Sequence, residues 1–302
     1  QPPPPGPSGG GMGLAELAQL VELERLPADI LREAGRGALR PEVAEAWVRL
    51  ACTPGLEALC LRSGFLRRRL LADPRFLFKA LFQAGVGATG GCVQEVRRWR
   101  AGGDAEASAG WSAEAPFFAV DLLVGIALDF ALVSLLAPVA ALGAGAAGAG
   151  GGALAGFRAF RAGLPRGLCE RAAAGQPAFT AGQRVASLAL RSAEVAVAGA
   201  ALGAFGQLAA NTVFVARKSI DRGHAEGYSA PSAGTVAAAW SGLAVLSSLR
   251  FQAIVGAERL VEQGCGGSPL LTLASTVFLR GGDHVLWEQG LLPGFSGTGG
   301  GQ

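Results

Sequence analysis

The chain has 302 residues, a net charge of +3 and a mean hydropathy of +0.37, and half of its residues are hydrophobic while only 16% are charged. This composition excludes a disordered chain, is unusual for a soluble enzyme, and does not by itself predict a nucleic-acid partner. The five cysteines are odd in number and form no CxxC pair, so we expect neither a disulfide framework nor a zinc site. We also expect no other bound metal and no cofactor.

Both ends of the chain are predicted to be flexible. Residues 1–13 are a Pro/Gly tract, QPPPPGPSGGGMG, which cannot pack into a core and is interpreted as disordered. Residues 293–302 are similarly rich in glycine and are predicted to form a flexible tail.

Residues 14–75 are predicted to form a small helical region that is soluble or lies on a membrane surface. Its apolar residues have an ordinary amphipathic pattern, and prolines mark the starts of helices near Pro27, Pro41 and Pro54. The stretch GFLRRRLLADP contains three arginines in succession: Arg67, Arg68 and Arg69. We interpret them as a solvated face, and the alternative is a site for anionic lipid headgroups.

Residues 76–292 are predicted to form a helical membrane domain. A helix needs about twenty apolar residues to cross a bilayer, and the chain has three segments of this kind, 117–142, 193–216 and 233–257. A fourth candidate is 269–290, which contains charged residues, and 76–96 is a weaker candidate because it is glycine-rich and partly polar. The sequence therefore predicts an all-α fold, with three to four spanning helices preceded by the small helical region.

Small residues in 193–216 predict close helix packing. Gly199, Gly203 and Gly206 stand among many alanines, and they form a thin helix face. Such a face lets the backbone of a second helix approach closely.

Polar side chains interrupt the apolar segments, and polar residues within a membrane are by default candidates for a transport pathway. An acid there could bind an amine, and an arginine could hold a carboxylate through two hydrogen bonds. We therefore predict a substrate-binding set: Asp121, Asp129, Arg191, Glu194, Gln207, Asn211, Arg250 and Asp283. No P-loop, HExxH or GxSxG motif occurs, so we expect no enzymatic activity.

Arg250 lies inside the apolar run 233–257. Inserting one arginine costs about 3 kcal/mol, and the apolar residues of the run contribute about −3.6 kcal/mol, so insertion is marginal. Arg250 could extend to the end of the run, about 10 Å away. The alternative, which we predict, is that it faces the bundle interior and pairs with an acid, Asp129 first and Asp121 second, because one pairing relieves two buried charges.

Several stretches, in one order and with similar spacing over residues 26–292, resemble elements of the RETICULATA and RETICULATA-related proteins of plants and green algae. The stretches are LPAD (26–29), GFLRRRLLADPRFLFKALFQAGVG (64–87), DLLVGIALDFALVSLLAP (121–138), VARKSID (215–221), SSLRFQAIVGAE (247–258) and LRGGDHVLW (279–287). Two departures are Ser248 and Asp283, where the family elements have Asn.

The resemblance implies an integral protein of the chloroplast envelope, in its inner membrane, with a cleaved transit peptide. It also implies transport of small metabolites such as amino acids, basic ones in particular. The expected partners are then the lipid bilayer and a small-molecule substrate, and a carrier with so few spans would need to form a homo-oligomer. The alternative is a non-transporting envelope scaffold or regulator of plastid and leaf development.

Overall fold

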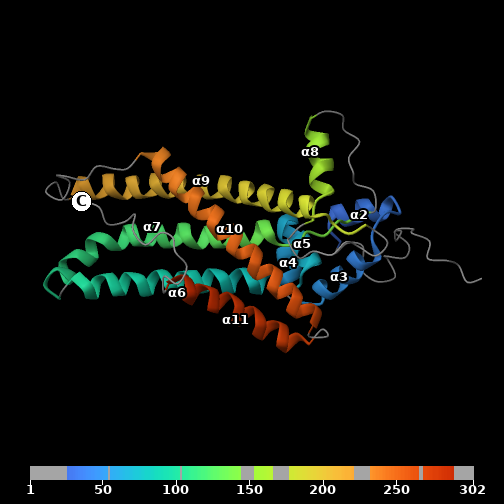
Figure 1. Ribbon diagram of the computed structural model, residues 1–302, viewed down its shortest axis with the longest axis horizontal. Helices are drawn as coiled ribbons and strands as arrows, with labels where there is room; N and C mark the ends of the chain where they lie inside the picture. Colours follow the sequence, from blue (N-terminus) through green and yellow to red (C-terminus); the bar gives the residue numbers. More distant parts are fainter. Residues whose placement is uncertain are drawn as a thin grey trace, which may run out of the picture. The chain divides into compact units, whose positions relative to one another are not determined.

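A computed structural model of the chain describes residues 26–53, 55–102, 104–143, 153–165, 177–220, 232–264 and 268–288. Within these ranges the secondary structure is helical, and the β-type pairing is a single isolated antiparallel bridge between Leu39 and Gly143 (Figure 1). The expected all-α fold is therefore confirmed for the described part of the chain. The predicted flexible ends, 1–13 and 293–302, lie outside the described residues.

The chain divides into two compact units, Gln1–Leu77 with Ala137–Gly163, and Phe78–Leu136 with Leu164–Gln302. The helices of the first unit are α2 (Ala28–Gly35), α3 (Pro41–Ala51), α4 (Leu56–Arg62), α5 (Gly64–Ala72) and α8 (Ala153–Ala162). The second unit contains α7 (Asp104–Leu136), α9 (Ala181–Ile220), α10 (Ala233–Gly264) and α11 (Pro269–Glu288). It also contains α6 (Phe76–Gly102), except for the first two residues of that helix.

Short amphipathic helices build the first unit around a small core. Ile30, Leu39 and Trp47 have no exposed surface. Proline opens α3 at Pro41, as predicted, because its fixed φ suits the first helical turn. These helices have 7 to 11 residues, too few to cross a bilayer. The location of residues 14–75 outside the hydrocarbon stays a prediction.

The segment after α7 belongs to the first unit because backbone hydrogen bonds fix it there. The N–H of Arg40 donates to the carbonyl of Leu142 at 3.1 Å, and the N–H of Ala140 donates to the carbonyl of Arg68 at 2.9 Å. α7 ends at Leu136, six residues before the end of the predicted span 117–142, because Pro138 disfavours helical geometry at the residue before it.

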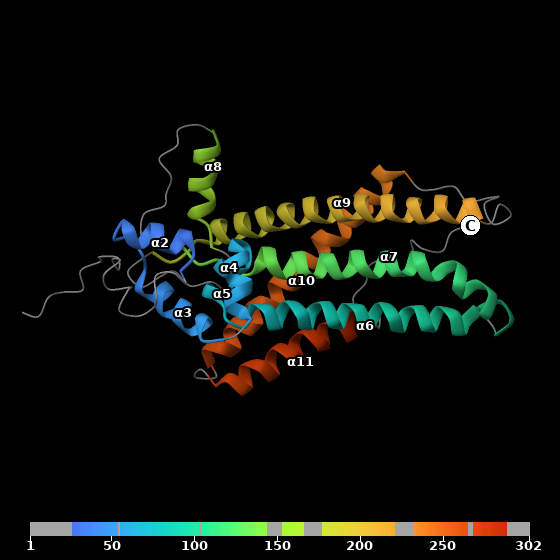
Figure 2. The same cartoon turned by 180° about the vertical axis from the view of Figure 1, so that it is seen from behind.

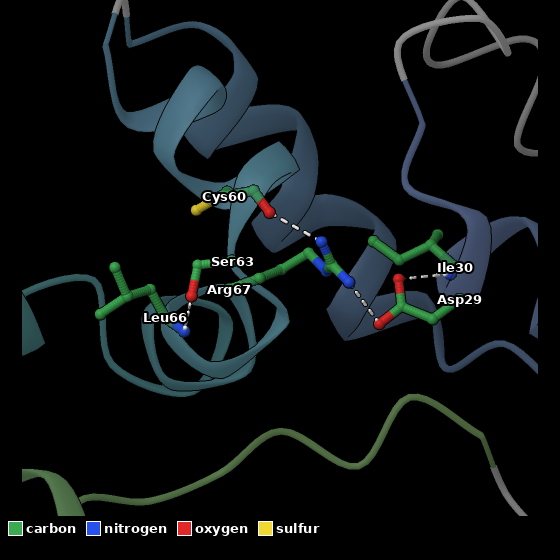
Figure 3. Close-up of polar contacts among 6 residues, drawn as sticks. All are labelled: Asp29, Ile30, Cys60, Ser63, Leu66 and Arg67. Carbon is green, nitrogen blue, oxygen red and sulfur yellow. Dashed lines mark hydrogen bonds and ion pairs between the residues drawn. The ribbon is translucent and has the colours of Figure 1, made fainter.

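Two of the three consecutive arginines of α5 are buried, which corrects the expectation of a solvated or lipid-facing cluster. Arg67 and Arg69 have 8% and 9% of their surface exposed, while Arg68 is exposed. The guanidinium of Arg67 lies between two acceptors (Figure 3): Nη1 donates to the Cys60 carbonyl at 2.7 Å, and Nη2 contacts the Asp29 carboxylate at 2.7 Å. Arg67 therefore holds α5 against the start of α2 and the end of α4.

Replacing Arg67 by alanine is expected to open this part of the first unit. The substitution leaves the Asp29 carboxylate and the Cys60 carbonyl without their donor, which costs about 1–3 kcal/mol. Cys60 has no exposed surface, so its alkylation in an otherwise cysteine-free full chain reports local opening. We expect alkylation about tenfold faster or more.

The chemistry of Cys60 sharpens this measurement. Burial raises the pKa of the Cys60 thiol, and the positive charge of Arg67 partly offsets that rise. Removing Arg67 therefore makes the thiolate scarcer, so that faster alkylation can only come from better access. Arg68→Ala is the matched control, and an equal rate in both variants would contradict the structural role of Arg67.

Four helices of the second unit are long and apolar enough to cross a bilayer: Phe76–Arg100, Ala115–Leu136, Ala181–Ala216 and Gly234–Val261. Large apolar side chains on them are open to the surroundings, including Leu123, Val197 and Phe205, each more than 60% exposed. Exposed apolar side chains of this kind suit helices that face lipid. The predicted 269–290 segment forms α11, which is not among the four, whereas α6 contains the weaker candidate 76–96 and is among them.

The expected close packing of the glycine face of α9 is confirmed. α10 crosses α9 at an oblique angle in both views (Figures 1 and 2), and these two helices make the most extensive helix–helix contact among the described elements. A Cβ at Gly199 or Gly203 would meet Trp240 of α10 within 2.7 Å, and one at Gly206 would meet Val124 of α7 at 2.7 Å. The glycines therefore set the distances from α9 to both neighbours.

Candidate functional site

A cavity of about 400 Å³ lies along α6 and α7, which run side by side in both views (Figures 1 and 2). Glycines line it from both helices, Gly87 and Gly91 on α6 and Gly125 on α7, and they leave room because they have no side chains. The polar residues of its lining are Gln94, Glu95, Arg98, Asp121 and Asp129.

One part of the cavity holds an acid beside an ion pair. Arg98 and Glu95, one turn apart on α6, form a salt bridge of 2.8 Å, and the charges of both act on Asp121 of α7. Asp121 is exposed. These three groups together carry a net charge of −1, because Arg98 balances one of the two acids.

A second acid, Asp129, lines the cavity eight residues further along α7, about 12 Å away at the helical rise. The side chain of Gln83 on α6 makes a hydrogen bond to it. A Cβ at Gly87 would overlap its Oδ2 atom, so the absence of a side chain at Gly87 is what gives this carboxylate its place against α6.

Two ion pairs join α10 and α11, and they lie close enough to Asp129 for their charges to act on it. Nε of Arg250 contacts Oδ2 of Asp283 at 3.0 Å, and Arg280 binds both carboxylate oxygens of Glu258, at 2.7 and 3.0 Å. The side chains of Arg280 and Glu258 are only 2% and 3% exposed. The charges of Arg250, Arg280 and Asp283 all act on Asp129, so residues of three helices form one electrostatic cluster.

Arg250 has an acidic partner other than the two that were predicted for it. Arg250 faces the interior of the unit, with 16% of its side chain exposed, as expected, and its ion pair with Asp283 of α11 joins it to an acid other than the two predicted on α7. Asp129 acts on the guanidinium through its charge. The reason is geometric: α11 packs directly on α10, which brings Asp283 to Arg250.

The predicted polar residues of α9 lie away from the cavity and have partners on their own helix. Arg191 and Glu194 form an ion pair of 2.8 Å across one turn. Gln207 donates a hydrogen bond to Asn211 at 2.7 Å, also across one turn. Neither pair is part of the cavity lining. Of the predicted set, Asp121 and Asp129 line the cavity, and the charges of Arg250 and Asp283 act on Asp129.

The sequence prediction missed five residues of this region: Gln83, Glu95, Arg98, Glu258 and Arg280. Glu95 and Arg98 stand near the end of the weaker candidate span 76–96. Charged residues are common at the ends of spans, so these two did not indicate a binding site. Glu258 and Arg280 stand in the stretches SSLRFQAIVGAE and LRGGDHVLW, which also contain the predicted site residues Arg250 and Asp283. An acid and an arginine in adjacent apolar helices could have been paired on that basis.

The chain matches known proteins of one kind. Residues 68–257 match a family model described as "RETICULATA-like: Protein RETICULATA-related". The chain is 33% identical over 264 residues to "Protein RETICULATA, chloroplastic" and 32% identical over 270 residues to "Protein RETICULATA-RELATED 1, chloroplastic", both of Arabidopsis thaliana. Each alignment covers 86% of this chain and 58% of the relative, so the chain spans less than two thirds of the relatives' length. No solved structure matches it.

Proposed function

Because this chain belongs to the RETICULATA-related family, we propose that it is an integral protein of the chloroplast envelope, in its inner membrane, that transports small metabolites, basic amino acids in particular. The chloroplast location is supported by the names of its relatives, which are described as chloroplastic. The membrane location is supported by the four helices of spanning length and composition.

The observation that carries the transport proposal is the acidic cavity between α6 and α7. Three acids, Glu95, Asp121 and Asp129, line it with one arginine, Arg98. In a membrane domain this excess of negative charge is costly when unbalanced, so a cation in the cavity is favoured. A cationic metabolite would supply the missing charge.

The spacing of Asp121 and Asp129 supports a substrate with two cationic groups. The two residues are about 12 Å apart along α7. In an extended lysine the two nitrogens are about 7 Å apart, and a charge-assisted hydrogen bond at each end adds about 2.8 Å. One lysine or arginine could therefore reach both acids, while its own carboxylate could pair with Arg98.

Uptake by proteoliposomes tests the proposal, after alkaline carbonate extraction has shown that the protein stays in the membrane pellet. We expect uptake of radiolabelled lysine and arginine and little uptake of leucine or glutamate. Asp121→Asn should lower lysine uptake about tenfold, because it removes one charged contact. Glu45→Gln, which neutralises an exposed acid of α3, is the matched control.

The alternative, an envelope scaffold without transport activity, predicts a different result. The protein would then resist carbonate extraction but take up none of the tested metabolites. Release of the protein into the carbonate supernatant would contradict both functions, because both need a membrane-integral chain.

A further inference from the structure

Asp129, Arg250, Glu258, Arg280 and Asp283 form a polar cluster of three acids and two arginines. Arg250 is balanced by Asp283, and Arg280 is balanced by Glu258. The charges of Arg250, Arg280 and Asp283 all act on Asp129. Asp129 is the third carboxylate of the cluster, which has only two guanidinium groups. These five residues therefore carry a net charge of −1 when all three acids are ionised, and the count holds for the group as a whole when the neighbouring His284 is neutral. Such a charge inside an apolar bundle needs a cation or a proton to balance it.

The partner of Asp129 on α6 suits a carboxyl group that exists in two protonation states. Gln83 is 3% exposed, and its side chain makes a hydrogen bond to Asp129. An ionised carboxylate can only accept, so the Gln83 amide donates through Nε2. Its Oε1 atom has no hydrogen-bond partner among the described residues. If the amide turned over, Oε1 would accept the O–H of a protonated Asp129 instead.

We propose that Asp129 is a proton-binding site, which takes up one proton when the cavity holds no cation and releases it when a cation binds, and that the Gln83 amide serves both states. The proton comes from water that reaches Asp129 through the cavity, and no bond other than O–H forms or breaks. The proton leaves Asp129 when a cation enters the cavity, so a positive charge balances the extra carboxylate both with and without the bound cation. The release step rests on the proposed transport of cations.

Other titratable groups surround Asp129 and must be separated from it. From α10 the neighbouring charge is Arg250, and from α11 the neighbouring charges are Arg280 and Asp283. His284 follows on α11, and its charge acts on Asp283. A variant at His284 is therefore needed as a control for Asp129.

Infrared difference spectroscopy of the purified full chain, titrated with acid, tests the proposal without any need for transport. A protonated carboxyl group gives a carbonyl stretching band that an ionised one lacks. The chain has 23 acidic residues, so the Asp129 band is the one found in the spectrum of the wild type minus that of Asp129→Asn at each pH. We expect this difference band to appear as the pH is lowered, to move in Gln83→Leu and to persist in His284→Gln. Identical spectra of the wild type and Asp129→Asn at every pH would overturn the proposal.

A pair of glycine variants tests the same site through its geometry. Gly87→Ala places a methyl group where Oδ2 of Asp129 lies, so the hydrogen bond to Gln83 should break and the band should shift. Gly85→Ala adds the same methyl on the same helix with no atom within 4 Å, and the band should stay unchanged. Identical spectra for the two variants would contradict the role given to Gln83.

Addition of lysine hydrochloride to weakly buffered protein, followed with a pH-sensitive dye, tests the exchange. We expect release of about one proton per chain in the wild type and none in Asp129→Asn. Uptake of lysine without proton release would overturn the exchange while leaving the transport proposal intact. A titrating Asp129 band in a protein that takes up no metabolite would instead contradict the transport proposal alone.

Discussion

Replacing Arg280 by methionine is expected to lower the free energy of unfolding by about 3–5 kcal/mol, a large part of the stability of a typical domain. The cost comes from Glu258, which has 3% of its side chain exposed and would lose both hydrogen bonds that Arg280 gives it. Thermal unfolding of the detergent-purified protein should show a midpoint lower by on the order of 10 °C.

The control for this prediction is a double variant that removes both charges together. Glu258→Leu with Arg280→Met should recover most of the lost stability, because no unpaired charge then remains in the interior. Arg259→Ala, at the partly exposed neighbour of Glu258, should change the midpoint little. A double variant as unstable as Arg280→Met alone would show that the pair contributes packing rather than charge balance.

Replacing Gly199 by alanine is expected to destabilise the second unit by about 1–3 kcal/mol, although alanine is the better helix former. The added Cβ would lie 2.7 Å from the carbonyl oxygen of Trp240 and 2.5 Å from the Cβ of Ala244. Backbone atoms cannot turn away as a long side chain can, so α9 and α10 must move apart along their most extensive contact. The unfolding midpoint in detergent measures the effect.

Gly242→Ala is the matched control, because it makes the same change on α10 where no atom lies within 4 Å. It should be neutral or stabilising by up to about 1 kcal/mol, as expected for glycine replaced within a helix. Equal stability of the two variants would contradict close packing at Gly199.

Local pattern was enough to predict the helices. Apolar runs of spanning length, with glycines at Gly199, Gly203 and Gly206, predicted both the all-α fold and the close packing of α9, because these features depend on composition and period within one segment. The start of α3 at Pro41 followed in the same way from the fixed φ of proline. Buried Arg67 could not be predicted, because its acceptors lie 7 and 38 residues away in the sequence.

The candidate site was only partly predictable. The sequence identified Asp121 and Asp129 as candidates because carboxylates are rare inside apolar segments, and both line the cavity. It could not select between them and the equally unusual polar residues of α9, which have partners one turn away on their own helix. Their role in substrate binding stays a prediction.

By itself the sequence determined that the described part of the chain is helical, that 117–142, 193–216 and 233–257 contain segments apolar enough to span a bilayer, and which charged residues stand inside them. These properties depend on a residue and its neighbours within a few turns. The tertiary structure alone decided which polar side chains meet: Arg250 with Asp283, Arg280 with Glu258, and Asp129 with Gln83. Each of these contacts joins two helices. Helix order, rotation and crossing angle come from side-chain packing between segments far apart in the chain, and the pattern within one helix does not encode them.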